Sequence, residues 1–116
     1  MSQSDCLFCK IASGAIPADL VHEGKRLVAF RDINPQAPLH VLVIPREHVA
    51  SLAAAADGSG GLLGEALLLA AEIARREGVA EDGYRTVINT GEHGGQTVHH
   101  LHVHLLGGRP FSWPPG

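Results

Sequence analysis

The sequence predicts an α+β fold in which an antiparallel sheet of about five strands packs against one long and one short helix. Short segments rich in Val, Ile and Leu follow one another between turn residues, which is typical of antiparallel strands. Residues 62–77 form a longer segment whose apolar residues recur at helical spacing. Because strands and helices do not alternate regularly, this order of segments favours an antiparallel sheet over repeated βαβ units.

Length and composition predict one ordinary globular domain spanning residues 1–116. Hydrophobic residues make up 45% of the chain and aromatic residues only 4%, so the core is expected to be aliphatic. The net charge is −3 and the pI is about 6.2, without a basic stripe, so duplex nucleic acid is not an expected partner. The chain shows no signal-peptide pattern and no apolar run of membrane-spanning length. We therefore expect a cytoplasmic protein.

The first third of the chain is expected to form a short helix and two strands. Residues 6–12 suit a helix that ends near Gly14, with Asp5 as its N-cap, because an Asp side chain accepts hydrogen bonds from free helix N–H groups. Residues 19–23 and 27–31 have the composition of strands separated by a turn. The core side chains expected from these strands are Val21, Val28 and Phe30.

A loop and a central strand are expected next. Residues 32–38 contain two prolines and follow directly on a strand end, where ligand contacts are common. Residues 39–44 are strongly apolar and predict a central strand. His40 interrupts this apolar run, and it either satisfies its own hydrogen bonds in the core or supports a nearby site. Residues 46–49 begin a polar turn or a short helix.

The long helix is predicted at residues 62–77, with Gly78 as its C-terminal stop. Residues 57–61 before it are rich in glycine, but no Lys followed by Ser or Thr completes a phosphate loop. An exposed linker is therefore the simpler interpretation of that segment. One face of the helix is apolar and is expected to cover the sheet. This face comprises Leu63, Ala66, Leu67, Ala70, Ile73 and Ala74.

A further strand and a glycine-rich turn are expected after the helix. Residues 83–89 predict a strand that has Asn89 at its end, and residues 90–95 predict the turn. The segment formed by Gly94, Gly95, Gln96 and Thr97 has the composition of a turn that cradles a phosphate group.

Four of the eight histidines lie within six residues near the C-terminus. His100, His102 and His104 alternate with apolar residues, and this period of two predicts a strand that carries all three imidazoles on one face. His99 has the opposite parity and is expected on the apolar side. A row of imidazoles suits metal ligation, or nucleophilic and acid–base chemistry on a phosphate. The alternative is a polar sheet face that happens to use histidine.

The pattern His-φ-His-φ-His-φ-φ, in which φ is apolar, fits residues 100–106 and resembles the signature of the histidine triad (HIT) family. Residues 32–38, 42–45, 94–96 and 113–116 are similar to the Hint branch of that family, the purine nucleoside phosphoramidases. The resemblance implies a HIT-like fold whose sheet continues across a homodimer, formed by pairing of the long helix and an adjacent strand. Trp113 in the C-terminal tail would then lie near the partner's active site.

The resemblance also implies a reaction, the hydrolysis of the P–N bond in purine nucleoside 5′-phosphoramidates. His102 would be the nucleophile that forms a nucleotidyl-imidazole intermediate, the carbonyl of His100 would hold its tautomer, and His104 would bind phosphate oxygens. His40 would lie next to the triad and hold its histidines in position without contacting the substrate. The remaining implied substrate contacts are Asp32 with a ribose hydroxyl, Ile33 with the purine, and Asn89, Gly95, Gln96 and Thr97 with phosphate oxygens and the leaving group.

A structural zinc ion is expected near the N-terminus. Cys6 and Cys9 have Cys-x-x-Cys spacing, and metal-bearing HIT members join such a pair to a histidine after the apolar strand and to the first triad histidine. The matching positions are His48 and His100, so two thiolates and two imidazoles would complete a tetrahedral site. The competing interpretation is a pair of reduced cysteines packed as small apolar residues. No acidic pair lies beside the triad, so we expect catalysis without an added divalent metal.

Three other functions stay open at the level of sequence. The protein could be a metalloenzyme in which the three triad histidines bind a catalytic metal. It could bind nucleotides without turning them over. Within the enzyme class, hydrolysis of dinucleoside polyphosphates is the nearest competitor, and the tail at residues 113–116 favours the phosphoramidase branch over it.

Overall fold

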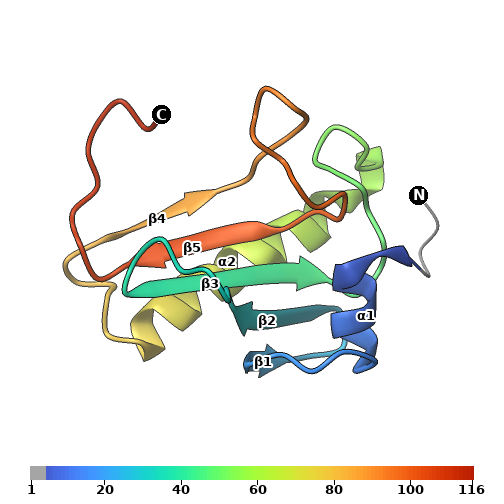
Figure 1. Cartoon of the computed structure of the whole chain (residues 1–116), viewed down its shortest axis with the longest axis horizontal. Helices are drawn as coiled ribbons and strands as arrows, with labels where there is room; N and C mark the ends of the chain where they lie inside the picture. The colour runs from blue at the N-terminus through green and yellow to red at the C-terminus, as the bar shows by residue number, and fades with distance from the viewer. Residues whose placement is uncertain (1–4) are drawn as a thin grey trace.

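The computed structural model describes residues 5–116 and contains a five-stranded antiparallel sheet with a helix on each face (Figure 1). The strand order is β1-β2-β3-β5-β4, and every neighbouring pair is antiparallel. Within the described residues, neither helix has the length and apolar character needed to cross a membrane. The elements are α1 (Leu7–Ser13), β1 (Leu20–Glu23), β2 (Leu27–Arg31), β3 (Leu39–Pro45), the short 3-10 helix η2 (Asp57–Ser59), α2 (Gly60–Arg76), β4 (Tyr84–Val87) and β5 (Val103–Gly107).

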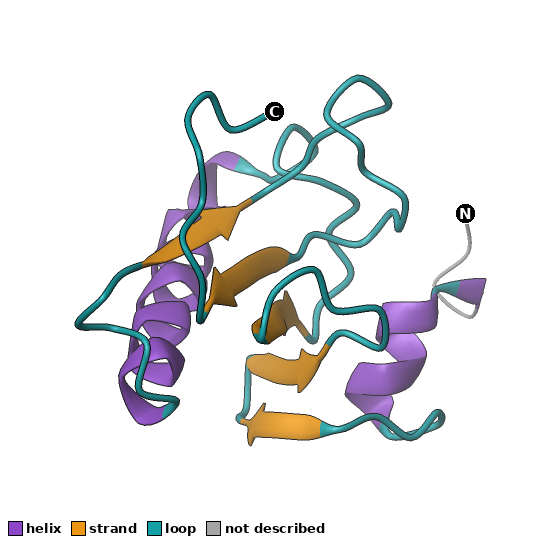
Figure 2. Cartoon of the chain, turned by 60° about the vertical axis from the view of Figure 1, so that its left-hand side comes forward, coloured by secondary structure: helices purple, strands orange, loops and turns teal. Residues whose placement is uncertain are grey.

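Side chains of β3 alternate between two separate cores, because successive residues of a strand point to opposite faces of the sheet. Val41 and Val43 pack in the cluster beneath α2, whereas Leu42 and Ile44 pack in the cluster beneath α1. Figure 2 shows the two helices on opposite sides of the sheet. Since all of β3 is buried, this central strand is covered on both faces.

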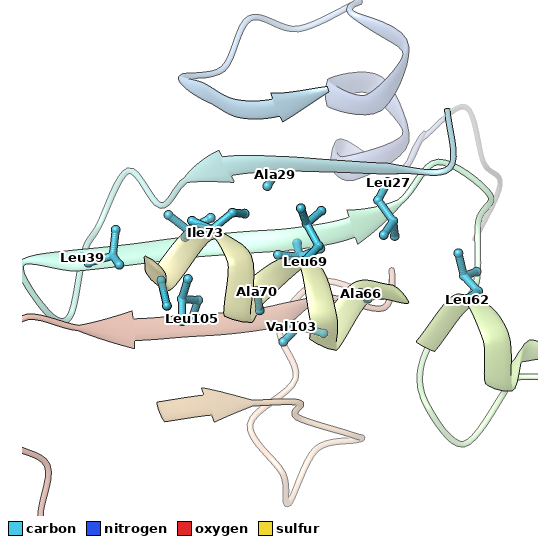
Figure 3. Packing of buried hydrophobic residues seen from close by; sticks show 13 residues of the cluster. Leu27, Ala29, Leu39, Leu62, Ala66, Leu69, Ala70, Ile73, Val103 and Leu105 are labelled. Carbon is cyan, nitrogen blue, oxygen red and sulfur yellow. The ribbon is translucent and has the colours of Figure 1, made fainter. Parts of the chain in front are cut away.

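The helix α2 covers one face through Ala66, Ala70, Ile73 and Ala74, as predicted, while its N-terminal half faces the sheet with different leucines (Figure 3). The buried positions there are Leu62 and Leu69, whereas Leu67 is 42% exposed and Leu63 is only half-buried. The prediction of Leu63 and Leu67 as core residues was wrong. The leucine-rich first half of the helix offers two apolar stripes, and periodicity alone did not determine which of them contacts the sheet.

Several element boundaries differ from the prediction. Cys6 rather than Asp5 is the N-cap of α1, and its Sγ accepts a hydrogen bond from the N–H of Cys9 at 3.4 Å. Gly14 ends this helix with φ at +83°, a left-handed conformation that favours glycine, so this part of the prediction is confirmed. Residues 46–49 begin with a bend, in agreement with the turn rather than the helix of the two predicted alternatives. The predicted linker at residues 57–61 is instead helical, because η2 occupies Asp57–Ser59 and α2 begins at Gly60.

The histidine segment is a strand only in its second half. Strand β5 begins at Val103, so His100 and His102 precede the sheet and the prediction of one strand through all three histidines was wrong. The physical reason is a hydrogen bond to another segment of the same chain. The N–H of Leu101 donates at 2.6 Å to the carbonyl of Val49, which lies beyond the end of β3 and outside the sheet. His99 is exposed and does not lie on the apolar side.

Candidate active site and metal cluster

A cluster of imidazoles lies on the sheet face that α1 covers. His104 in β5 pairs with Leu42 in β3, and His40 lies two residues earlier in β3, so both side chains leave the sheet on the same face. Nε2 of His40 lies 2.9 Å from Nδ1 of His104. The rings of His102 and His104 contact each other with their centroids 4.9 Å apart, and Phe8 of α1 packs edge-on against His102 at 5.1 Å.

The hydrogen bonds of these rings determine where their protons are. Nδ1 of His102 lies 2.7 Å from the carbonyl oxygen of His100, which can only accept, so Nδ1 carries the hydrogen and Nε2 keeps its lone pair. The N–H of Gln36 donates to Nδ1 of His40 at 3.0 Å. Nε2 of His40 therefore carries a hydrogen and can donate it to Nδ1 of His104, which leaves Nε2–H of His104 as a donor.

Burial favours the neutral form of His40 and His104, and of the neighbouring His100, because it lowers the pKa of each ring. Desolvation, followed by the nearby His102 and His40, lowers the pKa of His104 to about 4, against a smaller opposing effect of Asp32. Desolvation also lowers the pKa of His40 and of His100. Neutral rings are consistent with the tautomers deduced from the hydrogen bonds, and a neutral ring is the form that can act as a nucleophile.

The geometry disfavours a catalytic metal held by the three triad histidines. His100 points away from the other two, with its Nδ1 at 3.3 Å from Sγ of Cys6 and its Nε2 at 2.8 Å from the carbonyl of Pro45. Ligand atoms of Asp32, His40 and His104 do lie within 4.8 Å of one another. However, the N–H of Gln36 donates to Nδ1 of His40, so the ring hydrogen is on Nε2. Nε2 is the atom that would have to bind the metal, and in this tautomer it has no free lone pair.

A pocket of about 340 Å³ opens in front of His102 and His104. Thr97 and Val98 form one side of it, and Asp32 and Ile33 form another. Its apolar walls come mainly from α1 and the segment after it. The sequence did not predict that these residues line a pocket, although the apolar residues on one side of α1 indicated that this side is covered. These wall residues are Leu7, Phe8, Ile11, Ile16, Pro17, Ala18, Phe30 and Leu42.

Four of the predicted substrate contacts lie outside the lining of this pocket. Asn89 is half-buried two residues beyond β4, and Trp113 is 83% exposed in the C-terminal tail. The N–H of Gly95 donates to the carbonyl of Glu92 at 3.0 Å, so it closes the turn rather than facing a ligand. The side chain of Gln96 is 8% exposed and is held by backbone groups of its surroundings.

Cys6, Cys9, His48 and the first triad histidine, His100, form a second cluster, with their ligand atoms within 4.8 Å of one another. Sγ of Cys9 lies 3.3 Å from Nδ1 of His48 and 3.5 Å from Nδ1 of His100. Both cysteines are free thiols. Burial, followed by the neighbouring Cys6, raises the pKa of the Cys9 thiol to about 11, so a cation would be needed to hold the thiolate at neutral pH.

This donor set fits a tetrahedral zinc ion. In such a site a sulfur and a nitrogen ligand lie about 3.5 Å apart, which matches the S···N separations of 3.3–3.5 Å. Nε2–H of His100 donates to Pro45, and this second hydrogen bond orients the ring so that the lone pair of Nδ1 points at the thiols. Two sulfurs and two nitrogens leave no open coordination position for a substrate.

Comparison with known proteins gives consistent matches over nearly the whole chain. Purine nucleoside phosphoramidase of Escherichia coli K12 is 47% identical over 108 residues, 93% of this chain and 91% of that protein. The 14 kDa zinc-binding protein of Zea mays is 48% identical over 118 residues, 100% of this chain and 91% of that protein. The crystal structure of a HIT family hydrolase from Legionella pneumophila superimposes with a TM-score of 0.95 at 53% identity, and covers 97% of this chain and 100% of that one.

The model of the HIT domain matches residues 13–111, which include both the sheet and the histidine segment. The similarity extends from sequence to fold, since a second solved structure, a histidine triad protein from Clostridium difficile, superimposes with a TM-score of 0.93 at 41% identity and covers 97% of each chain. The resemblance inferred from the histidine pattern is therefore confirmed, and the chain belongs to the HIT domain family.

Proposed function

We propose that the protein hydrolyses the P–N bond of purine nucleoside 5′-phosphoramidates and releases an amine and the nucleoside 5′-monophosphate. The observation that carries this proposal is the hydrogen bond from Nδ1–H of His102 to the carbonyl of His100, which leaves Nε2 with a free lone pair beside the pocket. The Escherichia coli relative named purine nucleoside phosphoramidase supports the substrate class.

The reaction would proceed in two displacements at phosphorus. Nε2 of His102 forms a bond to phosphorus while the P–N bond to the amine breaks, and the amine takes up a proton. Water then attacks the nucleotidyl-His102 intermediate and releases a proton to solvent, and the phosphorus–imidazole bond breaks to regenerate the free ring. Nε2–H of His104 would donate to a phosphate oxygen, with His40 holding its tautomer, and the hydroxyl of Thr97 would pass a solvent proton to the amine.

The nucleoside would occupy the apolar part of the pocket. One carboxylate oxygen of Asp32 accepts a hydrogen bond from the N–H of Asn34 at 2.8 Å, and the other lies 3.5 Å from Nε2 of His40. This second oxygen would also accept a hydrogen bond from a ribose hydroxyl. Ile33 is fully exposed in the free protein and would close over the base. Asn89 and the partner subunit's Trp113 would contribute at the leaving-group side.

The Cys6, Cys9, His48 and His100 cluster would hold a structural zinc ion. The zinc-binding relative from maize and the match of the donor set to a tetrahedral site support this assignment. The ion would supply a fixed cross-link between α1 and the segment before β5, and the hydrolysis would need no other divalent metal. The free thiols suit a reducing compartment such as the cytoplasm.

A substrate panel tests the proposed reaction against its alternatives. We expect turnover of adenosine and guanosine 5′-phosphoramidates, slower hydrolysis of dinucleoside polyphosphates, and full activity after removal of loosely bound metal with a chelator. Faster cleavage of the polyphosphates would favour the competing hydrolase function. Tight binding of AMP (adenosine 5′-monophosphate) without turnover of any substrate would identify a nucleotide-binding protein instead of an enzyme.

A further inference from the structure

The carboxamide of Gln96 is a buried polar group whose hydrogen bonds all go to the protein. Its Oε1 accepts from the N–H of Gly91 at 3.0 Å. Its Nε2 donates to the carbonyl of Ala50 at 2.7 Å and to the carbonyl of Val98 at 3.1 Å. Three separate points of the chain are therefore joined through one side chain that is 8% exposed.

The orientation of this carboxamide follows from its partners. The two carbonyl groups of Ala50 and Val98 can only accept, and the N–H of Gly91 can only donate, so a rotated amide would mismatch all three contacts. Both hydrogens of the NH₂ group and one oxygen lone pair are in use. The side chain consequently has no hydrogen left to donate to a bound phosphate.

These bonds close the turn that precedes the pocket. The backbone N–H of Gln96 donates to the carbonyl of Gly91 at 3.0 Å, so Gly91 and Gln96 exchange one backbone and one side-chain hydrogen bond. Within the turn, Gly94 approaches the carbonyl of Thr90 so closely that a Cβ atom there would collide with it. The turn is thus tightly folded, and the carboxamide of Gln96 bonds to its first glycine, Gly91.

The same side chain fixes the residues that form one side of the pocket. Thr97 and Val98 directly follow Gln96 and line the pocket together with His102 and His104. Ala50 lies two residues after His48, so the carboxamide ties the pocket side to the segment that carries a cluster ligand. A displacement of about 1 Å near reacting groups can cost about 100-fold in rate, which makes this fixation relevant to chemistry.

We propose that Gln96 is a positioning residue, whose carboxamide locks the Gly91–Gln96 turn and thereby places Thr97 against the phosphate of the substrate. This role replaces the direct substrate contact that we expected from the sequence. It rests on the proposed nucleotide chemistry of the pocket. Glutamate would be unsuitable at this position, because its second carboxylate oxygen would face the carbonyls of Ala50 and Val98 without a hydrogen between them.

The nearly isosteric substitution Gln96→Glu tests the proposal. We expect kcat/KM for an adenosine phosphoramidate to fall about 100-fold and AMP affinity to fall as well, whereas adenosine affinity stays within about twofold of wild type. Hydrogen exchange of the Gly91 and Gln96 amides should accelerate, and exchange in β3 and β5 should not. A merely destabilising change would instead weaken adenosine and AMP equally.

The matched control is His93→Glu, which adds the same negative charge on the exposed part of the same turn. It should retain AMP affinity and turnover within about threefold, because exposed charges interact weakly across solvent. Wild-type levels of AMP binding and kcat/KM in Gln96→Glu, equal losses in both variants, or parallel losses of adenosine and AMP would each overturn the positioning role. A wild-type protein that binds AMP but cleaves no phosphoramidate would refute only the proposed reaction, since the binding comparison and the exchange data still test the turn.

Discussion

At the scale of single residues, the carbonyl of His100 is a decisive group, because it fixes which nitrogen of His102 is free to react. The same residue offers Nδ1 to the thiols of Cys6 and Cys9 and anchors Nε2 on Pro45. The carbonyl oxygen, Nδ1 and Nε2 of His100 therefore each have a separate partner. A change in the position of this residue would disturb both His102 and the cluster of Cys6, Cys9 and His48.

The substitution His102→Ala should remove the proposed nucleophile without changing the rest of the pocket. We expect the hydrolysis rate to fall by about 1,000-fold or more, because no neighbouring ring presents an equally unprotonated nitrogen, while AMP still binds. Rapid-quench mass spectrometry of the wild-type protein should detect a nucleotidyl adduct on His102. An adduct on another residue, or turnover close to wild type in the variant, would contradict the assignment.

The lowered pKa of His104 predicts a loss of stability in acid. Its folded-state pKa of about 4 lies below the value of about 6.5 for an unfolded histidine, so between these two values the unfolded chain binds more protons. The stability is therefore complete above about pH 6.5 and falls as the pH decreases towards 4. After allowance for solvent screening, we expect His104 to account for about 1 kcal/mol of the loss between pH 7 and pH 5.

Urea unfolding at both pH values measures this contribution. In the variant His104→Gln, whose amide does not titrate, the fall in unfolding free energy between pH 7 and pH 5 should be smaller by about the same amount. An identical fall in the two proteins would show that His104 does not contribute to the acid sensitivity.

At the scale of elements, the short helix α1 serves two sites at once. Its N-cap and first turn carry Cys6 and Cys9, and its apolar side supplies Leu7, Phe8 and Ile11 to the pocket in front of His102 and His104. Phe8 also packs against the rings of His100 and His102. A metal ion that fixes the start of this helix would thereby fix a wall of the pocket.

The double variant Cys6→Ser, Cys9→Ser should lose the zinc ion. We expect about one equivalent of zinc per chain in wild-type protein purified without a metal-binding tag, and less than about a tenth of an equivalent in the variant, because serine hydroxyls are poor zinc ligands. Elemental analysis decides this, with His99→Ala as a control because His99 is exposed and adjacent to a ligand. Zinc-free wild-type protein, or unchanged zinc in the double variant, would rule the site out.

Local sequence patterns predicted the existence and type of the main elements, but not the details that depend on distant contacts. The apolar run at residues 39–44 and the glycine after α1 correspond closely to β3 and to the end of the helix. The choice of Leu62 over Leu63 depends on how α2 docks on the sheet. The histidine segment leaves the strand because Leu101 bonds to Val49, a partner about fifty residues away that no local period reveals.

The candidate site shows the same division. The histidines and the Cys-x-x-Cys pair were visible as motifs, and the family resemblance supplied their partners. The hydrogen bonds of Gln96 were not predictable, because the carbonyls of Ala50 and Val98 are backbone groups whose positions depend on the complete fold. The contribution of Phe8 likewise depends on the placement of α1 against the sheet.

At the scale of the whole molecule, the sheet separates a chemical face from a structural face. His40 and His104 project on the side of α1, whereas the residues that alternate with them pack against α2. The outer side of α2 still presents Leu67 at 42% exposure and Leu68 at 71% exposure. Strand β4 lies at the adjacent edge of the sheet, so its outer backbone groups can pair with another chain.

These two unpartnered features predict a symmetric homodimer in which α2 packs against the α2 of a second copy and β4 extends the sheet across the two-fold axis. Light scattering at micromolar concentration should give twice the chain mass of 12.2 kDa for wild type. Leu68→Glu should give a monomer, because it places a charge in the proposed apolar contact, whereas Leu20→Glu, at a residue 44% exposed on the opposite edge strand β1, should remain dimeric. A monomeric wild-type mass would refute the dimer, and a dimeric Leu68→Glu variant would exclude this helix face as its interface.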